Sequence, residues 1–247
     1  MRGNLQKTLD RADKLITVSN VVRHELINDL GVPADKIHTT YLGADPVFHP
    51  RGPAETQGIM EKYQLQHGGY VLFVGTLEPR KGVDLLLDAW TSLPAAVRSG
   101  YKLVLAGASG WRNAETLERV QSLETHGEVQ WLRYVPLDEL PLLYSGAAAF
   151  SYPSLYEGFG LPVLEAMASG VPVICTANTS MAEFAASAPL LFERGVSEEF
   201  AQCLNSLLED DALRQRHKLL GLDRASHFTW QRFAQETVAV YRTVSDG

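Results

Sequence analysis

The stretch "AAFSYPSLYEGFGLPVLEAMASGVPVICTA", residues 148–177, contains two strand-like apolar runs separated by a run with helical spacing. Pro162 suits the first position of a helix, and Gly170 suits its C-terminal cap. We therefore expect a helix from about Leu161 to Ser169, with Glu165 in its first turn. The flanking runs are apolar on both faces, which is typical of strands in a parallel sheet covered by helices on each side.

The same alternation of strand-like and helical runs extends along most of the chain. Because helices separate consecutive strands, the sequence predicts an α/β fold, a Rossmann-like parallel sheet with helices on both faces. In such sheets ligands bind beyond the carboxyl ends of the strands. The strand-like runs span residues 14–19, 36–41, 70–76, 102–108, 129–135, 148–154, 172–177 and 189–194. The helical runs between them span residues 20–31, 82–93, 113–124, 138–147, 161–170 and 180–187.

The organisation of the chain changes near its two ends. Residues 42–58 are rich in proline and glycine, and they predict a linker. The roughly 45 residues before this linker are too few to form a domain by themselves. After residue 194 the chain has only helical runs, which end with "FTWQRFAQETVAVY" at residues 228–241.

Composition restricts the class of protein. The 247 residues carry a formal net charge of −7, which argues against a nucleic-acid partner because such binders usually carry a basic stripe. The sequence lacks a run of ~18 apolar residues, which a transmembrane helix needs, and its polar N-terminus lacks the apolar core of a signal peptide. Cys175 and Cys203 are far apart, which favours a reducing compartment over a disulfide framework. We expect a cytoplasmic protein.

The turn in "GTLEPRKGVDLLLDAW", residues 75–90, combines glycine with positive charge. Gly75 ends a predicted strand, Arg80 and Lys81 follow, and Gly82 opens a helix. Two cations beside a helix N-terminus suit a diphosphate, because backbone N–H groups and side-chain charges act on the same anion. The alternative is a solvated loop with two surface cations. The spacing of a Walker phosphate-binding loop is absent.

Two glutamates flank the Gly-Phe-Gly turn of the first stretch. Glu157 precedes the turn, and Glu165 lies in the helix after it. Glycines let backbone N–H groups approach a ligand closely, but carboxylates at the same place repel phosphate. We therefore expect them to bind neutral groups such as sugar hydroxyls. The alternatives are a loop carboxylate for Glu157 and a favourable helix-dipole interaction for Glu165.

A third candidate turn lies in "RYVPLDELPLLYSGA", residues 133–147. It joins a predicted strand to a short helix with acidic residues at its start. The backbone groups of Tyr134 and Val135 could face a flat base there. An ordinary strand–helix connection explains the same pattern.

Taken together, these motifs resemble the retaining, nucleotide-sugar-dependent glycosyltransferases of family 4, which have the GT-B fold. The resemblance covers essentially the whole chain, and its most specific element is Glu157-x7-Glu165 within "EGFGLPVLEAMASGVPVI". The variant "GTLEPRKG" is similar to the mannosyltransferase-like branch. The resemblance implies transfer of a hexose such as mannose, with retention, from a nucleotide-diphosphate sugar.

The resemblance also implies roles for individual residues. Glu157 would contact hydroxyls of the donor sugar, and Glu165 would bind the ribose of the nucleotide. Arg80 and Lys81 would neutralise the diphosphate as it leaves, without a metal or other cofactor. Val135 would lie at the base. The other donor-binding positions are Gly75, Thr76, Gly158, Phe159, Gly160 and Leu161. Family members often carry arginine where this chain has Thr76.

By the same resemblance the chain is the donor-binding half of such an enzyme. Residues 1–48 would be the end of the N-terminal acceptor domain and the hinge, residues 49–228 the nucleotide-sugar-binding domain, and residues 229–247 the C-terminal crossover helix. The partners would be a nucleotide-sugar donor, a glycan or lipid-linked acceptor and a separate N-terminal domain. Contact with the membrane would be at most peripheral, at its inner face.

Two other functions fit the sequence. A non-catalytic nucleotide-sugar-binding module or partner subunit would account for the missing part of the first domain. A hydrolysing sugar-nucleotide epimerase shares the fold, although the pair of glutamates argues against it.

Overall fold

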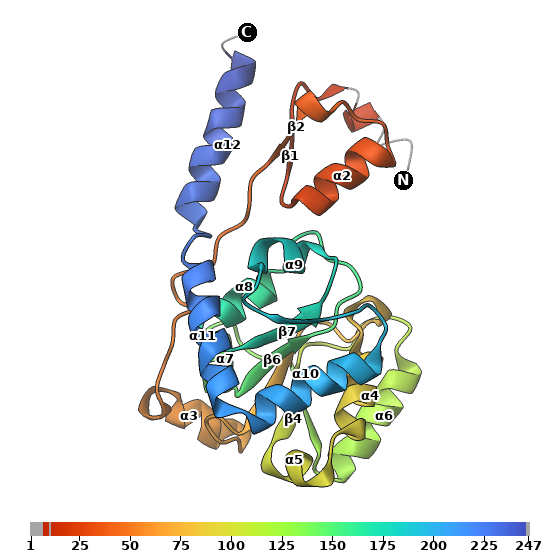
Figure 1. Cartoon of the computed structure of the whole chain (residues 1–247), viewed down its shortest axis with the longest axis vertical. Helices are drawn as coiled ribbons and strands as arrows, with labels where there is room; N and C mark the ends of the chain where they lie inside the picture. The colour runs from red at the N-terminus through yellow and green to blue at the C-terminus, as the bar shows by residue number, and fades with distance from the viewer. Residues whose placement is uncertain (1–6, 10, 246–247) are drawn as a thin grey trace.

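The computed structural model describes residues 7–9 and 11–245. Figure 1 shows a small N-terminal part and a larger α/β domain, joined by an extended segment. In the small part, strands β1 (Leu15–Thr17) and β2 (Ile37–Thr39) pair in parallel around helix α2 (Asn20–Asn28) and the short 3₁₀ helix η1 (Ala34–Lys36). Ser19 starts α2, because its side chain accepts a hydrogen bond from the amide of Val22.

The larger domain is built on a six-stranded, wholly parallel sheet with the order β5-β4-β3-β6-β7-β8. This is the doubly wound order, because the chain moves outward from β3 in one direction and from β6 in the other. The strands are β3 (Tyr70–Val74), β4 (Lys102–Ala106), β5 (Val129–Arg133), β6 (Ala149–Tyr152), β7 (Val173–Thr176) and β8 (Leu190–Phe192).

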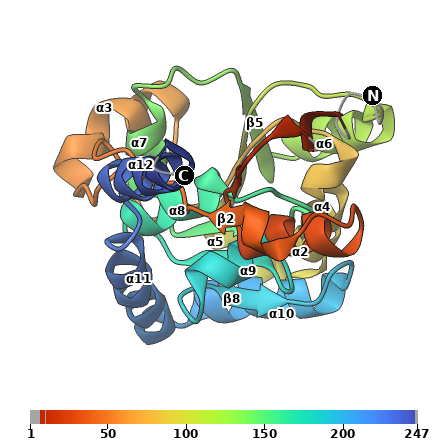
Figure 2. The ribbon, with the colours of Figure 1, turned by 90° about the horizontal axis from the view of Figure 1, so that it is seen from above.

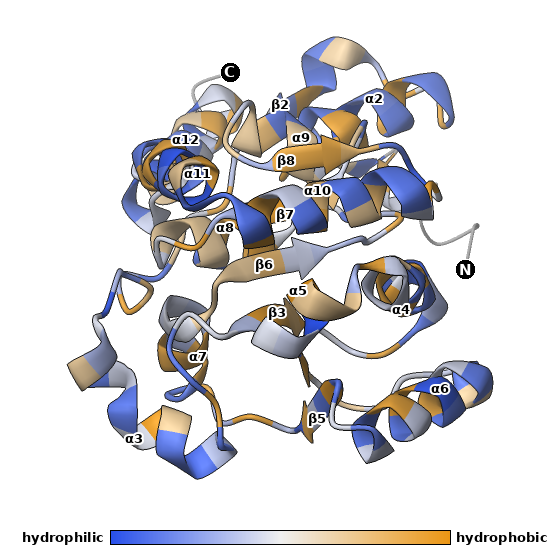
Figure 3. Ribbon diagram, turned by 60° about the horizontal axis from the view of Figure 1, so that its bottom comes forward, coloured by the Kyte–Doolittle hydropathy of each residue, from blue (hydrophilic) through white to orange (hydrophobic). Residues whose placement is uncertain are grey.

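Helices cover both faces of this sheet (Figure 3). On one face α4 packs against α6 and α10, and on the other α7 packs against α3 and α8. Their bounds are α3 (Pro53–Tyr63), η2 (Pro79–Lys81), α4 (Val83–Ser92), α5 (Ala95–Gly100), α6 (Ala114–Thr125), α7 (Leu140–Gly146), α8 (Leu161–Ala168), α9 (Ser180–Ala185), α10 (Ser197–Glu209) and α11 (Asp211–Ala225).

The sheet is buried on both faces, as its apolar runs predict. Every residue of β6 and β7 is buried, and so are the first four residues of β3. The ring of Tyr152 stacks on those of Phe73 and Phe150 at centroid distances of 5.8 and 5.7 Å. The predicted α/β fold and all eight predicted strands are confirmed.

Two helices were not predicted. Helix α3 begins at Pro53, inside the expected linker of residues 42–58, so the second part of that prediction is wrong. Pro53 is at the first helical position, and the Glu55 carboxylate accepts a hydrogen bond from the amide of Gly52, which together stabilise this start. The short helix α5 was also missed.

The two parts of the molecule meet where residues 40–48 pass residues 226–230. Ala44 pairs with Thr229 there. A Cβ on Gly43 would lie 2.1 Å from the amide nitrogen of Trp230, so only glycine allows the two segments to approach so closely. The rings of Tyr41, Phe159, Phe184 and Phe228 pack together beside this crossing.

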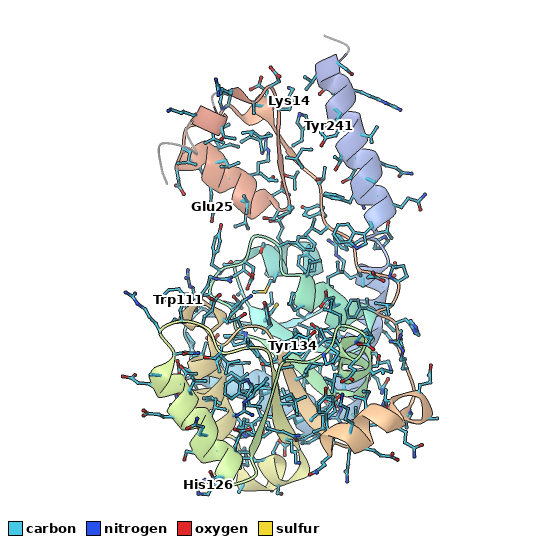
Figure 4. The ribbon with its side chains drawn as sticks, turned by 180° about the vertical axis from the view of Figure 1, so that it is seen from behind. Lys14, Glu25, Trp111, His126, Tyr134 and Tyr241 are labelled. Atoms are coloured by element: carbon cyan, nitrogen blue, oxygen red, sulfur yellow. The ribbon has the colours of Figure 1, made fainter. Side chains whose placement is uncertain are left out.

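The last helix, α12 (Trp230–Ser245), leaves the larger domain and runs alongside the N-terminal part (Figures 1 and 2). The two line a shared cavity of about 400 Å³ that includes Lys14 and Tyr241, which are labelled in Figure 4. The assignment of residues 229–247 as a crossover helix stays a prediction, and residues 246–247 lie outside the described part of the chain. Within the described part of the chain, none of the helices is both long and apolar enough to cross a membrane.

Candidate functional site

A pocket of about 490 Å³ opens at the carboxyl ends of β3 and β6. These are the strands between which the doubly wound order reverses, the usual position of a ligand in such sheets. Val18 and Leu42 from the N-terminal part complete its wall. The predicted site residues that line it are Gly75, Thr76, Arg80, Lys81, Glu157, Phe159, Gly160 and Leu161.

The loops after β3 and β6 lie directly against each other. Gly82, which ends η2 and precedes α4, has φ +68°, and a Cβ there would lie 2.3 Å from the carbonyl oxygen of Pro153. The carbonyl of Arg80 accepts a hydrogen bond from the amide of Leu155 at 2.8 Å. The cations from one loop therefore face the carboxylate from the other.

Glu157 binds both predicted cations. Its Oε1 lies 2.7 Å from Lys81 Nζ and 3.1 Å from Arg80 Nη1. The side chains of Lys81 and Glu157 are each only 12% exposed. The sequence predicted that Glu157 binds neutral hydroxyls while the cations bind the diphosphate. In the structure, the carboxylate of Glu157 forms ion pairs with both cations.

Glu157 is ionised at neutral pH. Burial by itself raises its pKa, but hydrogen bonds from Lys81 and Ser154 and the charges of Lys81 and Arg80 outweigh burial, so the pKa is lower than usual. The Ser154 hydroxyl donates at 2.7 Å and the Tyr152 hydroxyl at 3.2 Å to the same Oε1. A ligand that takes the cations would leave these two hydroxyls as partners of the carboxylate.

Arg80 is held by a second carboxylate. Its Nη2 lies 2.7 Å from Glu78, and its Nη1 donates to the carbonyl of Tyr156 at 2.7 Å. Glu78 also accepts a hydrogen bond from the indole of Trp111, an exposed side chain labelled in Figure 4. The guanidinium thus has a defined position at the rim of the pocket.

The Gly-Phe-Gly turn is fixed from outside the pocket. Ser180 at the start of α9 donates to the carbonyls of Glu157 and Phe159 at 2.7 and 3.0 Å. The ring of Phe159 is buried and stacks on Phe184 at 4.3 Å. Gly160, with φ +110°, forms the N-terminal cap of α8, so the free amides of that helix begin beside the pocket.

Glu165 lies one position further along its helix than the first turn predicted from the sequence. Helix α8 begins at Leu161 and ends at Ala168, one residue before the expected end. Glu165 is therefore the fifth residue of the helix and lies outside its first turn, which removes the proposed interaction with the helix dipole. Its Oε2 accepts a hydrogen bond from the buried hydroxyl of Tyr144 at 3.0 Å.

The Glu165 carboxyl group is mostly desolvated. Burial raises its pKa, the hydrogen bond from Tyr144 opposes this effect, and the charge of Asp45 adds to it, with a raised pKa as the net result. Glu165 is partly buried and has one hydrogen-bond partner among the described residues, Tyr144, so its carboxylate can accept further hydrogen bonds, for which ribose hydroxyls are suitable donors.

Three predicted residues are absent from the pocket lining that the described residues form: Gly158, Glu165 and Val135. Val135 has its side chain in the hydrophobic core. The neighbouring Tyr134 is 76% exposed after the end of β5 (Figure 4). The roles assigned to all the predicted site residues stay predictions.

The hydroxyl groups around Glu157 were not predicted from the sequence. Tyr152, Ser154 and Ser180 contact this carboxylate or its backbone. The signal for two of them was present, since "SYPS" spans the end of a buried strand and the turn beside the expected site. Ser180 is distant in sequence and had no such signal.

The N-terminal part contacts the same loop. The hydroxyl of Tyr156, the residue before Glu157, donates to Glu25 of α2 at 2.7 Å. Glu183 of α9 accepts hydrogen bonds from the amides of Asn20 and Val21 at 2.7 and 2.9 Å, and so caps α2 from the larger domain. The two parts therefore share polar contacts on both sides of the Gly-Phe-Gly turn.

Among the described residues, no group of three or more His, Cys, Asp or Glu side chains is placed to hold a metal ion.

A doubly wound α/β domain with a charged pocket at its switch point matches the C-terminal domain of the GT-B fold. The family model of glycosyl transferases group 1 matches residues 55–219. The chain belongs to this family.

Relatives and solved structures agree with this membership. The chain is 39% identical over 242 residues to O-antigen chain mannosyltransferase B of Escherichia coli, covering 98% of this chain and 64% of that protein. It is 28% identical to the serotype-specific mannosyltransferase WbdA of Escherichia coli, covering 90% of this chain and 28% of that protein. The chain thus spans less than two thirds of the length of these relatives.

Among solved structures, Anabaena HepE in complex with UDP and glucose superposes with a TM-score of 0.84 at 20% identity, covering all of this chain and 68% of that one. A glycosyltransferase from Rickettsia africae gives a TM-score of 0.84 at 18% identity, covering 98% of this chain and 67% of that one. Both likenesses show the fold.

Proposed function

We propose that this chain is the donor-binding half of a retaining glycosyltransferase that transfers a hexose such as mannose from a nucleotide-diphosphate sugar. The observation that carries the proposal is the contact of Arg80 and Lys81 with Glu157 in the pocket at the switch point of the sheet. The relatives named mannosyltransferases support the choice of sugar.

The chemistry follows from the charges in the pocket. A nucleoside diphosphate brings negative charge, for which Arg80 and Lys81 are the available partners, and the first amides of α8 lie beside them. Charge builds up on the departing diphosphate as the sugar leaves, so cations placed in advance stabilise the transition state more than the bound donor. No metal ion is needed for this role in the proposal.

Glu157 changes partners in this scheme. When the diphosphate takes the cations, the ionised carboxylate becomes free to accept hydrogen bonds from hydroxyls of the sugar. We assign it to positioning the sugar for attack by the acceptor hydroxyl from the same face as the leaving group. Glu165, with Tyr144 behind it, is assigned to the ribose of the nucleotide.

A glycan or lipid-linked glycan is the proposed acceptor, and the inner face of the membrane is the proposed place of peripheral contact. Among the described residues β1 and β2 pair only with each other, and two parallel strands are too few for a stable sheet. We therefore propose that a further N-terminal domain extends this sheet and supplies the acceptor site.

A thermal-shift panel of nucleotide sugars tests the donor assignment. At a concentration of ~100 times its dissociation constant, the true donor should add about 2.7 kcal/mol to the free energy of unfolding. GDP-mannose is the expected first candidate, with UDP-glucose and free mannose as comparisons. If none of the nucleotide sugars raised the melting temperature, and GDP and UDP did not either, the proposal would be contradicted.

A further inference from the structure

We infer that Tyr152 is a positioning residue for the candidate diphosphate site: its hydroxyl holds Lys81 in place when Glu157 turns away to the sugar. This inference rests on the proposed function. Tyr152 is the last residue of β6 and is fully buried, and its hydroxyl reaches the pocket between Lys81 and Glu157.

The contacts give the hydroxyl a double role. It accepts a hydrogen bond from Lys81 Nζ at 2.6 Å and donates one to Glu157 Oε1 at 3.2 Å. Lys81 therefore has one hydrogen bond to Tyr152 and one to Glu157.

The two partners of Lys81 differ in what they do to its charge. Glu157 is a carboxylate and neutralises the ammonium, whereas the Tyr152 hydroxyl is neutral and leaves the positive charge available to a phosphate. Burial raises the pKa of Tyr152, and the charge and hydrogen bond of Glu157 raise it further, so the hydroxyl stays protonated. It can hold the lysine without competing with the diphosphate.

The donor count of the ammonium agrees with this role. Lys81 Nζ has three N–H groups, and among the described residues two of them have protein acceptors, Tyr152 and Glu157. Departure of Glu157 would leave Tyr152 as the remaining protein partner and two N–H groups for phosphate oxygens. A flexible lysine then stays ordered at the time when its charge is needed.

The surroundings make the tyrosine itself rigid. Its ring stacks on those of Phe73 and Phe150, which belong to neighbouring strands of the sheet. A phenylalanine at position 152 would keep these contacts and remove only the hydroxyl. Tyr152→Phe is therefore a substitution with a narrow chemical effect.

The test is calorimetry of the full chain with GDP and UDP, and with guanosine and uridine. Tyr152→Phe should weaken whichever diphosphate the unchanged protein binds by about 3- to 10-fold, the effect of one hydrogen bond, while the nucleoside affinity stays within 2-fold. In a Lys81→Ala background the same substitution should have no further effect, because the two residues act as one unit.

Tyr70→Phe is the matched control. Tyr70 is equally buried and its hydroxyl donates to the carbonyl of Leu143, but it lies at the opposite end of the sheet, at the start of β3. This variant should leave both affinities unchanged. Melting temperatures of the two variants report whether either has lost packing.

The outcomes separate the inference from the proposed function. If the unchanged chain binds neither GDP nor UDP, the donor site itself is wrong, and the inference falls with it. If the chain binds a diphosphate and Tyr152→Phe binds it equally well, or weakens diphosphate and nucleoside alike, the positioning role is overturned while the donor site stands. The positioning role is also overturned if Tyr152→Phe lowers the diphosphate affinity of the Lys81→Ala variant by the same factor as that of the unchanged chain.

Discussion

Lys81 and Glu157 form a nearly buried ion pair at 2.7 Å across the two loops that bound the pocket. Removing one partner of such a pair leaves the other charge desolvated and without compensation. The pair thus joins the two loops, and opening it would free a second N–H group of Lys81 for a phosphate. The same contact sets both the stability of the site and its affinity for an anion.

Lys81→Ala and Arg80→Ala should weaken binding of the nucleoside diphosphate much more than binding of the nucleoside. Each loses a charge-assisted contact worth roughly 1.5–3 kcal/mol. Calorimetry with GDP, UDP and their nucleosides measures the difference. Lys102, whose ammonium donates to the carbonyl of Gln64 at the other end of the sheet, gives the control Lys102→Ala. Equal losses for diphosphate and nucleoside would place the two cations away from the phosphates.

Glu157→Gln should strengthen binding of the bare diphosphate and weaken binding of the complete donor. The amide no longer neutralises Lys81 and Arg80, so both cations are free for the phosphates. It is also a poorer acceptor for sugar hydroxyls, so the gain is lost once the sugar is attached. Calorimetry with GDP and GDP-mannose, or with the UDP pair, gives the two affinities. Weaker binding of the bare diphosphate would show that Glu157 does not compete for the cations.

The pH dependence of stability provides a separate test of Glu157. Its pKa in the folded protein is lower than usual, so the carboxylate contributes stability above the unfolded pKa of about 4.5. That contribution is lost as the pH falls through the lower, folded value. Melting temperatures of wild type and Glu157→Gln should therefore converge below pH 4.5. A constant difference between the two across this range would contradict the ion pair.

The close approach of the two loops can be tested at Gly82. Gly82→Ala places a Cβ 2.3 Å from the carbonyl oxygen of Pro153. It also puts alanine at φ +68°, a backbone conformation that strains any residue other than glycine. Gly68 has a similar φ of +75° with nothing within 4 Å, so Gly68→Ala reports the strain alone. Strain costs roughly 1–3 kcal/mol, and Gly82→Ala should lose clearly more in denaturant unfolding. If Gly82→Ala and Gly68→Ala lost the same free energy of unfolding, the two loops would not be in this close contact.

Sequence patterns predicted the sheet well because its strands are apolar on both faces and its helices follow at regular intervals. Prolines and glycines obscured α3, although Pro53 and Glu55 carry the signals of a helix start. The partners of Glu157 could be predicted only in part. Ser180 lies 23 residues beyond Glu157 and reaches its carbonyl only because α9 folds back over the turn. Such contacts depend on tertiary structure, which local spacing does not encode.

Glu165 offers the last test, because its expected effects on stability and on binding have opposite signs. Its pKa in the folded protein is raised, so folding favours the protonated form. The contribution of Glu165 to the free energy of unfolding is therefore fully present below the pKa of the unfolded chain, about 4.5. It is lost as the pH rises through the pKa of the folded protein. At pH 7–8 the buried carboxylate therefore lowers the free energy of unfolding. Glu165→Gln, which is neutral and nearly isosteric, should melt at a higher temperature there.

The same substitution should reduce binding if Glu165 holds the ribose. A neutral amide is a weaker acceptor than a carboxylate, so affinities for nucleoside and diphosphate should fall alike, by roughly 1–3 kcal/mol. Tyr144→Phe, which removes the hydroxyl that orients Glu165, should lower both affinities in the same direction. Calorimetry at pH 7.5 and melting curves from pH 4 to 8 measure the two effects. A more stable Glu165→Gln variant with unchanged nucleoside affinity would leave Glu165 without a role in ribose binding.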